Sequence, residues 1–380
     1  MINVFITGDF HAGGRIENLL NEERYDNIFG DLVTTIKESD LSLTNLESPL
    51  IENGTPIQKT GPSKKSSPKT VRALKFAGFQ LITLANNHIM DYGVEGLEKS
   101  MNLLNSYSLS YVGVGMNYDE ASVPFCTEIN GAKLCVINIA DNEFSTTCGN
   151  YPGANPLNPV ENYRSILSAK KNADHVIVVV HGGHENYNLP SPRIKQLFRF
   201  FAEAGASAVI GHHTHCYSGY EVYNGIPIFY SLGNFIFDRP GRVKSKWNYG
   251  LAVLLRLRKE TEFEIIPYNQ CGEKPGIEFL TDAEKNLFNK DINKLNSIIM
   301  DDSLLTSQFN NYCKNVRNLY SSYLEPHSMN ILHYLRNRNF IPSLLSRRKK
   351  LLYLNLIRCE AHRDVLMSLL QNNLLREDEA

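Results

Sequence analysis

Side chains of the metal-binding type recur through the first two-thirds of the chain, and each follows a strand-like run. They are Asp9, His11, Glu47, Asn87, His181, His213 and His215. A mixture of imidazole, carboxylate and amide ligands is typical of Zn, Mn or Fe sites and unlike the all-oxygen cage of Ca. No cysteine is placed to join them, which argues against a structural zinc site built on thiolates. The pattern predicts a site for two divalent metal ions.

The spacing of these residues carries more information than any one of them. His213 and His215 lie two apart in Gly-x-His-x-His, so on an extended chain they face the same side. A single histidine at the end of a strand is more often structural than functional, and Asp-x-His alone is a weak signal. Their recurrence at successive strand ends favours a metal centre over a purely structural protein.

Two further residues suit proton transfer at such a centre. Two divalent cations held by Asp9 and Glu47 and by neutral ligands keep a surplus of positive charge, which attracts phosphate or carboxylate. Metal ions roughly 3.5–4 Å apart can share a hydroxide and clamp the attacking and leaving oxygens, with Glu47 as the bridging carboxylate. His88 is the expected general acid for the leaving group. Asp91 is expected to orient the His88 ring.

The elements that must position these residues alternate between strand and helix patterns. A helix over 192–204 has Ser191 as its N-cap, Pro192 in its first turn and Gly205 as its stop. This alternation predicts an α/β protein with a covered sheet, in which the carboxyl ends of strands gather around one crevice. Strands are expected at 2–7, 40–45, 79–85, 133–140, 175–180, 206–210 and 226–232, and further helices at 69–77, 94–106 and 161–171.

The overall composition excludes several classes of protein. The 380 residues carry a formal net charge of -1, so no global charge favours nucleic acid, and no nucleic-acid partner is expected. The seven cysteines form no CxxC pair and indicate reduced thiols rather than a disulfide framework. Neither a signal peptide nor a membrane-spanning run is recognisable. These features predict a cytoplasmic protein.

The texture of the chain changes after the turn-rich segment 269–276. We expect a catalytic domain over 1–268 and a helical extension over 269–380. Between Ile331 and Leu370 the extension concentrates arginine and lysine among leucines. One interpretation is peripheral contact with an anionic membrane surface or an acidic partner. The alternative is a set of helices that pack on the catalytic domain with a solvated basic face.

Six segments, taken together, resemble one known family. They are GDFHAGGR (8–15), NLESPL (45–50), ANNHIMDYG (85–93), VVVHGGHEN (178–186), GHHTH (211–215) and SLGNFIFD (231–238). Their order and content resemble the CapA-like branch of the calcineurin-like metallophosphatase superfamily, which is associated with capsule and poly-γ-glutamate synthesis. The resemblance covers about residues 1–268. It implies a four-layer α/β/β/α sandwich.

The resemblance also implies roles for individual residues. Asp9 and His215 would hold one metal ion, and Asn87, His181 and His213 the other. His11 matches the Asp-x-His of the wider superfamily and would be a further ligand. Glu47 stands where most metallophosphatases have an aspartate, and this departure puts standard phosphodiesterase activity in doubt.

Five other residues of these motifs are candidates for contact with substrate or with the ligands themselves. They are Arg15, His184, Glu185, Asn234 and Asp238. Four of them also have a plainer interpretation. A loop arginine is commonly solvated, a Gly-Asn turn explains Asn234 without function, and packing or surface roles suit His184 and Glu185.

Three functional hypotheses follow. The first is a two-metal hydrolase, phosphoesterase-like, that acts on an anionic polymer or a phosphorylated glycan in capsule, exopolysaccharide or polyglutamate metabolism. The second is a component of amide-bond formation in capsule or poly-γ-glutamate synthesis. The chain has no GxxxxGK[ST] loop, so ATP-driven ligation would need a partner among the capsule-synthesis proteins. The third is a non-catalytic polymer-binding or scaffold protein.

Overall fold

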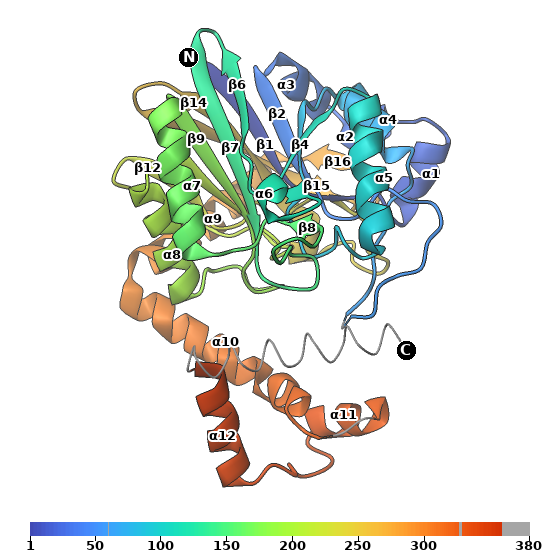
Figure 1. Cartoon of the computed structure of the whole chain (residues 1–380), viewed down its shortest axis with the longest axis vertical. Coiled ribbons are helices and arrows are strands. Elements are labelled where there is room, and N and C mark those ends of the chain that lie inside the picture. Colours follow the sequence, from blue (N-terminus) through green and yellow to red (C-terminus); the bar gives the residue numbers. More distant parts are fainter. Residues whose placement is uncertain (60, 327–328, 359–380) are drawn as a thin grey trace. The chain divides into compact units, whose positions relative to one another are not determined.

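The computed structural model describes residues 1–59, 61–326 and 329–358 (Figure 1). The chain forms two compact units, Met1–Phe309 and Asn310–Ala380. All of the predicted metal-binding residues belong to the first unit.

The first unit contains a large mixed sheet with the strand order β16-β15-β14-β1-β2-β3-β4, and β13 pairs with β1. Strands β1 to β4 run parallel to one another, whereas β14 to β16 are antiparallel additions at one side. The bounds are β1 Ile2–His11, β2 Leu41–Leu46, β3 Leu81–Thr83, β4 Ser110–Val112, β13 Asn234–Phe237, β14 Tyr249–Leu257, β15 Thr261–Gln270 and β16 Ile277–Phe279.

A second sheet has the order β11-β12-β10-β9-β7-β6. Its central strands β7, β9, β10 and β12 are parallel, and β6 and β11 are antiparallel edges. The bounds are β6 Phe125–Ile129, β7 Ala132–Ala140, β9 His175–His181, β10 Ala208–His212, β11 Tyr220–Tyr223 and β12 Ile226–Phe229. Strands β5 (Val114–Gly115) and β8 (Gly153–Ala154) form a separate short pair.

Alternating side chains of β1 show how the layers stack. Ile2, Val4 and Ile6 pack in a core shared with the second sheet. Phe5 points to the opposite face, into a core shared with helices, and Phe10 joins that core beyond a register irregularity of the strand around Asp9. Because successive residues of a strand face opposite sides, this alternation requires a layer on each face of the sheet.

Helices cover the outer faces of both sheets (Figure 1). The resulting α/β/β/α sandwich confirms the predicted fold class. The covering helices of the first sheet are α1 Arg15–Asn21, α2 Asp26–Phe29, α3 Leu32–Glu38, α4 Thr70–Ala77 and α5 Gly93–Ser106, and those of the second are α7 Pro159–Asn172 and α8 Pro192–Glu203. Helix α6 (Tyr118–Ala121) is a single turn beside β5 and β8.

Local signals explain where the helices begin and end. The Ser191 side chain accepts a hydrogen bond from the Ile194 backbone at the start of α8, and Pro192 occupies the first turn, as predicted. Helix α4 stops at Gly78, whose φ of 97° lies in the left-handed region that glycine adopts without strain.

The prediction that all cysteines are reduced thiols is wrong for one pair. Cys126 of β6 and Cys135 of β7 form a disulfide bond. The two residues face each other in the antiparallel register of the β6–β7 hairpin, a proximity that a search for CxxC spacing does not detect. Cys148, Cys216, Cys271 and Cys313 are free, and Cys359 lies outside the described residues.

The compartment of the protein stays a prediction. None of the helices in the described ranges is long and apolar enough to cross a membrane. The disulfide bond weighs against the predicted cytoplasmic location, because such bonds persist mainly in oxidising compartments.

Strand β16 lies inside the predicted helical extension 269–380, and the described chain after it is mostly helical. Its helices are α9 Asp282–Met300, α10 Asp302–Tyr323, α11 Asn330–Asn337 and α12 Arg347–Arg358. Strand β16 and helix α9 belong to the first compact unit, and the division after residue 268 stays a prediction. The sequence from 359 to Ala380, including the rest of the basic concentration, lies outside the described residues.

Candidate metal centre

The carboxyl ends of the central strands meet at one place and bring the predicted ligands together. In the first sheet, Asp9 is in register with Asn45 of β2 and with Asn234 of β13. In the second sheet, His181 at the end of β9 is paired with His212 at the end of β10. The Asn45 side-chain amide donates a hydrogen bond of 2.8 Å to Asp9 Oδ1 and so fixes this carboxylate.

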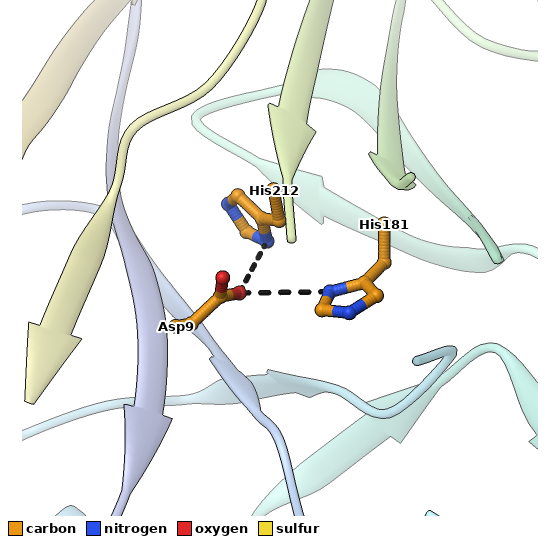
Figure 2. A group of neighbouring side chains, drawn as sticks. All are labelled: Asp9, His181 and His212. Atoms are coloured by element: carbon orange, nitrogen blue, oxygen red, sulfur yellow. Dashed lines mark ion pairs between the residues drawn. The ribbon is translucent and has the colours of Figure 1, made fainter. Parts of the chain in front are cut away.

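Asp9 is the centre of the first group of side chains that could hold a cation (Figure 2). Its Oδ1 lies 3.6 Å from His181 Nδ1 and 3.7 Å from His212 Nδ1. All three side chains are fully buried. The sequence had indicated His213 and His215 of the GHHTH motif, and His212 is an additional candidate ligand that sequence reasoning missed.

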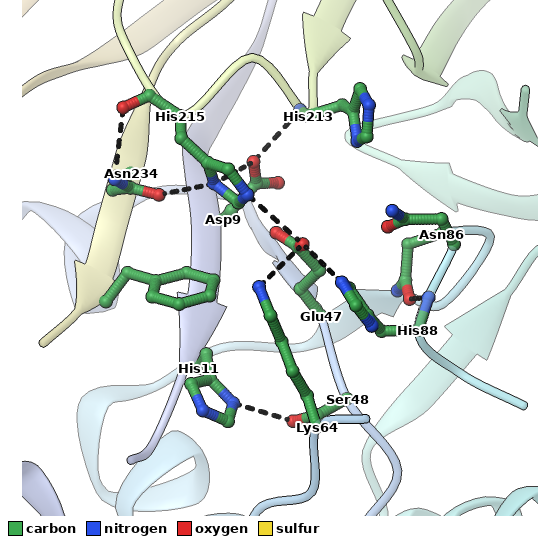
Figure 3. A network of polar contacts seen from close by, with 12 residues as sticks. Asp9, His11, Glu47, Ser48, Lys64, Asn86, His88, His213, His215 and Asn234 are labelled. Carbon is green, nitrogen blue, oxygen red and sulfur yellow. Dashed lines mark hydrogen bonds and ion pairs between the residues drawn. The ribbon is translucent and has the colours of Figure 1, made fainter. Parts of the chain in front are cut away.

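A second group is formed by Asp9, Glu47 and His215 (Figure 3). His215 Nε2 lies 3.6 Å from Glu47 Oε1. His215 Nδ1 lies 2.9 Å from Asn234 Oδ1, and the Asn234 amide group donates to the carbonyls of His215 and Trp247. Because this amide oxygen can only accept, His215 carries its proton on Nδ1 and turns the Nε2 lone pair toward Glu47.

A third contact set surrounds the other nitrogen of His181. His181 Nε2 lies 3.1 Å from Asn87 Oδ1 and 3.1 Å from His213 Nδ1. The His213 backbone N–H also donates to Asp9 Oδ2 at 2.9 Å. His213 has a φ of 90°, which non-glycine residues seldom adopt. The sharp turn at the end of β10 therefore aims the backbone of His213 at one predicted ligand and its ring at another.

The donor set fits a cation by two observations. Ligand atoms bound tetrahedrally to one ion at the usual Zn–N bond length lie about 3.4 Å apart, close to the 3.6 and 3.7 Å separations around Asp9 and Glu47. In addition, both oxygens of Glu47 and both ring nitrogens of His212 are buried without a hydrogen-bond partner in the described part of the chain. Buried polar atoms are rarely left unsatisfied, and a bound cation would satisfy them.

The acid–base properties of the cluster follow from its burial. Burial raises the pKa of Glu47 to about 8, against the smaller opposing effect of Lys64. Burial lowers the pKa of His212 to about 4 and those of His213 and His215 well below the usual value. Neutral imidazole is the form that binds metal ions, so these histidines are ready to do so near neutral pH.

Asp9 and His181 behave as an ion pair. Burial by itself would raise the pKa of Asp9, but the nearby His181 ring and its charge outweigh it and hold that pKa far below the usual range. Burial by itself would lower the pKa of His181, but the same interaction with Asp9 raises it. A cation bound here would replace the proton that His181 carries in this ion pair.

His88 and Asp91, the residues predicted for proton transfer, lie beside this cluster. Asp91 Oδ2 accepts a hydrogen bond of 2.6 Å from His88 Nδ1, and His88 Nε2 lies 3.8 Å from Glu47 Oε1. Burial lowers the pKa of His88 to about 4, although the hydrogen bond to Asp91 opposes this effect. The other ring nitrogen of His88, Nε2, thus faces Glu47.

Sequence comparison identifies the family of the chain. Residues 3–239 match the family described as bacterial capsule synthesis protein PGA_cap, and this range includes every predicted site residue from Asp9 to Asp238. The chain belongs to the PGA_cap family. This result confirms the CapA-like resemblance found in the six motifs.

Relatives with assigned names agree with the family. The chain is 32% identical over 277 residues to the capsule biosynthesis protein CapA of Bacillus anthracis, covering 70% of this chain and 67% of that protein. It is 31% identical over 271 residues to the PGA biosynthesis protein CapA of Bacillus subtilis (strain 168), covering 70% and 71%. A solved structure of a hypothetical protein from Thermus thermophilus covers 70% of this chain and 99% of its own, with 15% identity and a TM-score of 0.45.

The other predicted residues of the PGA_cap domain lie at different places. His11 is half-buried, with Nδ1 3.2 Å from Ser48 Oγ and its ring against Phe237, and the two cation-binding groups found among the described residues do not include it. Asn234 orients His215, as described above. The ligand role of His11 and the substrate roles of the motif residues stay predictions.

Arg15 and Asp238 bind each other. Arg15 Nη2 donates to Asp238 Oδ1 at 2.8 Å and Arg15 Nε donates to Asp238 Oδ2 at 3.0 Å. The guanidinium group also donates to the carbonyls of Cys271 and Gly272. This pair therefore ties the first helix to the turn after β15.

His184 and Glu185 follow the end of strand β9 in the HGGHEN motif. The His184 ring is half-buried against the rings of Tyr187 and Phe309, whereas Glu185 is exposed. The structure therefore groups His184 with the aromatic packing around Phe309.

Several residues near the centre escaped sequence reasoning. Asn45 and His212 lie within motifs that were noticed, so their neighbours gave a signal. Glu143 lies 4.0 Å from His213 Nε2 and accepts a hydrogen bond from the Asn87 amide. Lys59 and Lys64 come from an irregular loop without periodicity and gave none.

Proposed function

We propose that the chain is a metal-dependent hydrolase of the phosphoesterase type that uses two divalent ions (Mn, Zn or Fe). Its substrate is an anionic polymer or phosphorylated glycan of capsule, exopolysaccharide or polyglutamate metabolism. The observation that carries this proposal is Glu47, a fully buried carboxylate with no hydrogen-bond partner in the described part of the chain, surrounded by candidate ligands.

The ligand assignment follows the contacts. Asp9, Glu47 and His215 would hold one ion, and Asn87, His181 and His213 the other, with His212 available beside Asp9. When bound, the ions supply Lewis acidity and an activated water. The buried carboxylates number fewer than the charges of two divalent ions, so a positive surplus remains for an anionic substrate.

His88 and Asp91 would handle the proton of the leaving group. Asp91 occupies His88 Nδ1, so the proton that is transferred travels on Nε2, which faces Glu47. Because burial lowers the pKa of His88 to about 4, the protonated ring needs a nearby negative charge. An anionic substrate provides that charge when it binds.

The setting of this activity is inferred from the relatives. Their names refer to biosynthesis of capsule and of PGA, which supports association of this chain with other capsule-synthesis proteins. The exposed run Arg347 to Lys350 at the start of α12, with Leu351, Leu352 and Leu354 beside it, would allow peripheral contact with an anionic membrane surface.

The proposal is tested by metal analysis of the purified protein together with assays on chromogenic phosphomonoesters and phosphodiesters. We expect bound metal and metal-dependent turnover. His88→Ala should keep its metal and lose roughly 10²–10⁴-fold in turnover, as is usual for a general acid. Loss of metal from this variant would show that His88 is a ligand and overturn its role as an acid.

A second candidate is amide-bond formation, which the relatives' names favour because PGA biosynthesis requires it. The chain has no phosphate-binding GxxxxGK[ST] loop, so activation by ATP would come from a partner subunit. Strict ATP dependence of the purified single chain, without hydrolysis of any ester, would favour this candidate over the hydrolase.

A further inference from the structure

The loop between β2 and α4 brings two lysines to the centre. The Lys64 backbone N–H donates a hydrogen bond of 2.6 Å to Asp91 Oδ2, and Lys59 Nζ binds the other oxygen of the same carboxylate. The loop is therefore tied to the His88–Asp91 pair. Its position relative to the metal-binding cluster is fixed by these contacts.

The two lysines differ in how their charges are satisfied. The Lys59 side chain is 4% exposed and its Nζ binds Asp91 directly. The Lys64 side chain is 15% exposed, its Nζ lies 3.6 Å from Glu47 Oε1, and it sits 4.1 Å from the centre of the Phe237 ring. Within the described ranges we find no acceptor at hydrogen-bond distance from Lys64 Nζ. This ammonium group faces the cluster with its donors available (Figure 3).

We propose that Lys64 binds an oxyanion of the substrate, a phosphate or a carboxylate, beside the metal ions. The inference rests on the proposed function. Glu47 is the one carboxylate near Lys64 Nζ in the described structure, and a metal ion bound to Glu47 would neutralise its charge and leave Lys64 without a counter-ion. A largely buried ammonium group needs a counter-ion, and a substrate oxygen supplies it. Lys64 then selects substrates that carry a negative charge next to the reacting bond.

The loop offers a matched control. Lys65 is the next residue, but its side chain is exposed, with Nζ donating to the Glu52 carbonyl and lying near Tyr92. Lys64→Met and Lys65→Met therefore remove the same charge from the same loop, one inside the centre and one outside it. Lys64→Arg keeps the charge and serves as the conservative variant.

The test is calorimetric binding of inorganic phosphate and of glutarate to each metal-loaded variant, with metal content and melting temperature measured on the same samples. Lys64→Met should keep its metal and bind at least one probe roughly 10–100-fold more weakly, the usual effect of a lost charge-assisted hydrogen bond. Lys64→Arg should recover most of the affinity, and Lys65→Met should match the wild type. The probe that loses affinity identifies the oxyanion as phosphate or carboxylate.

Two results would overturn the inference. Unchanged affinity of metal-loaded Lys64→Met for both probes would show that Lys64 does not contact the anion. Loss of metal from Lys64→Met would show instead that Lys64 positions Glu47. Neither measurement needs turnover, so a wild type that binds metal and phosphate but hydrolyses nothing would defeat the hydrolase while leaving Lys64 as an anion-binding residue.

Discussion

The candidate metal centre and the helices after residue 310 both stood out in the sequence because of their charged residues, but these residues differ in their burial. Asp9, Glu47 and His181 are buried, and the register of parallel strands sets their distances. The basic residues Arg347 to Lys350 lie exposed on α12. Charged residues at the ends of these parallel strands are held at defined distances from one another, whereas the charged residues on the exposed helix are not.

The largest expected effect comes from a comparison within one strand. His181→Ala removes a side chain that contacts Asp9, Asn87 and His213, whereas His175→Ala changes the half-buried first residue of the same strand β9. We expect His181→Ala to lose metal and roughly 10²–10³-fold in turnover, as loss of catalytic electrostatics typically costs. Metal analysis and steady-state kinetics check this.

His175→Ala should retain both metal and turnover. Equal losses of metal and turnover in the two variants would mean that any substitution in β9 disrupts the centre, and would contradict a specific role of His181.

Without the metal, the stability of the folded protein should depend on the protonation of Glu47. Its pKa of about 8 in the folded metal-free protein exceeds the ordinary value of 4.5, so between these pH values Glu47 holds its proton in the folded state and has lost it in the unfolded state. The contribution of Glu47 to the free energy of unfolding should therefore fall as the pH rises from about 4.5 to about 8 and level off above. The buried histidines, whose pKa values are lowered, contribute with the opposite sign below about pH 6.5, so the difference between wild type and Glu47→Gln isolates the Glu47 part. Denaturant titrations of the chelated protein at several pH values measure this slope.

Glu47→Gln should abolish that part of the slope, since the amide does not titrate. Metal-loaded wild type should lack it too, because a cation keeps Glu47 ionised. A slope that persists in Glu47→Gln would assign it to other groups.

A smaller effect is expected at the disulfide bond. Cys126→Ser opens a short loop between β6 and β7 and should lower the free energy of unfolding by about 2–3 kcal/mol under oxidising conditions. Cys148→Ser, at an exposed free cysteine, is the matched control and should have little effect. Chemical unfolding with and without reductant measures both, and an identical response of the two variants would contradict a formed disulfide.

The smallest effect on the centre should come from α12. Replacing Arg347, Arg348, Lys349 and Lys350 by glutamine should leave metal content and turnover on a small ester within about twofold, since exposed charges contribute little to folding. Binding to anionic vesicles should fall. A loss of turnover without any change in vesicle binding would contradict the expectation that the basic residues of α12 act in membrane binding and not in turnover.

The α/β class could be predicted from the residues, because β-branched runs that end in polar residues locate parallel strands and their carboxyl ends. Asp9, His181 and His213 could be predicted in this way. The four-layer arrangement was implied by the resemblance to the CapA-like family. The sequence could not show which histidines of the GHHTH motif lie nearest Asp9. That depends on the left-handed backbone at His213, whose N–H donates to Asp9 while the His212 ring lies beside the same carboxylate. Sequence spacing alone does not give that turn.

Other features depend on contacts between segments. Lys64 reaches the centre only because its loop is hydrogen-bonded to Asp91. The disulfide bond depends on the register of the β6–β7 hairpin. Arg15 was a candidate for substrate contact, and only the structure shows that Asp238 occupies its guanidinium group. Local patterns identify elements, while these pairings arise from the way the elements pack.

The most direct test of the account is the metal stoichiometry of the purified wild type, compared with that of Glu47→Gln. We expect two divalent ions per chain in the wild type and fewer in the variant, because neither oxygen of the buried Glu47 has a hydrogen-bond partner in the described part of the chain. A wild type that binds no divalent ion after loading with Mn, Zn and Fe would contradict it.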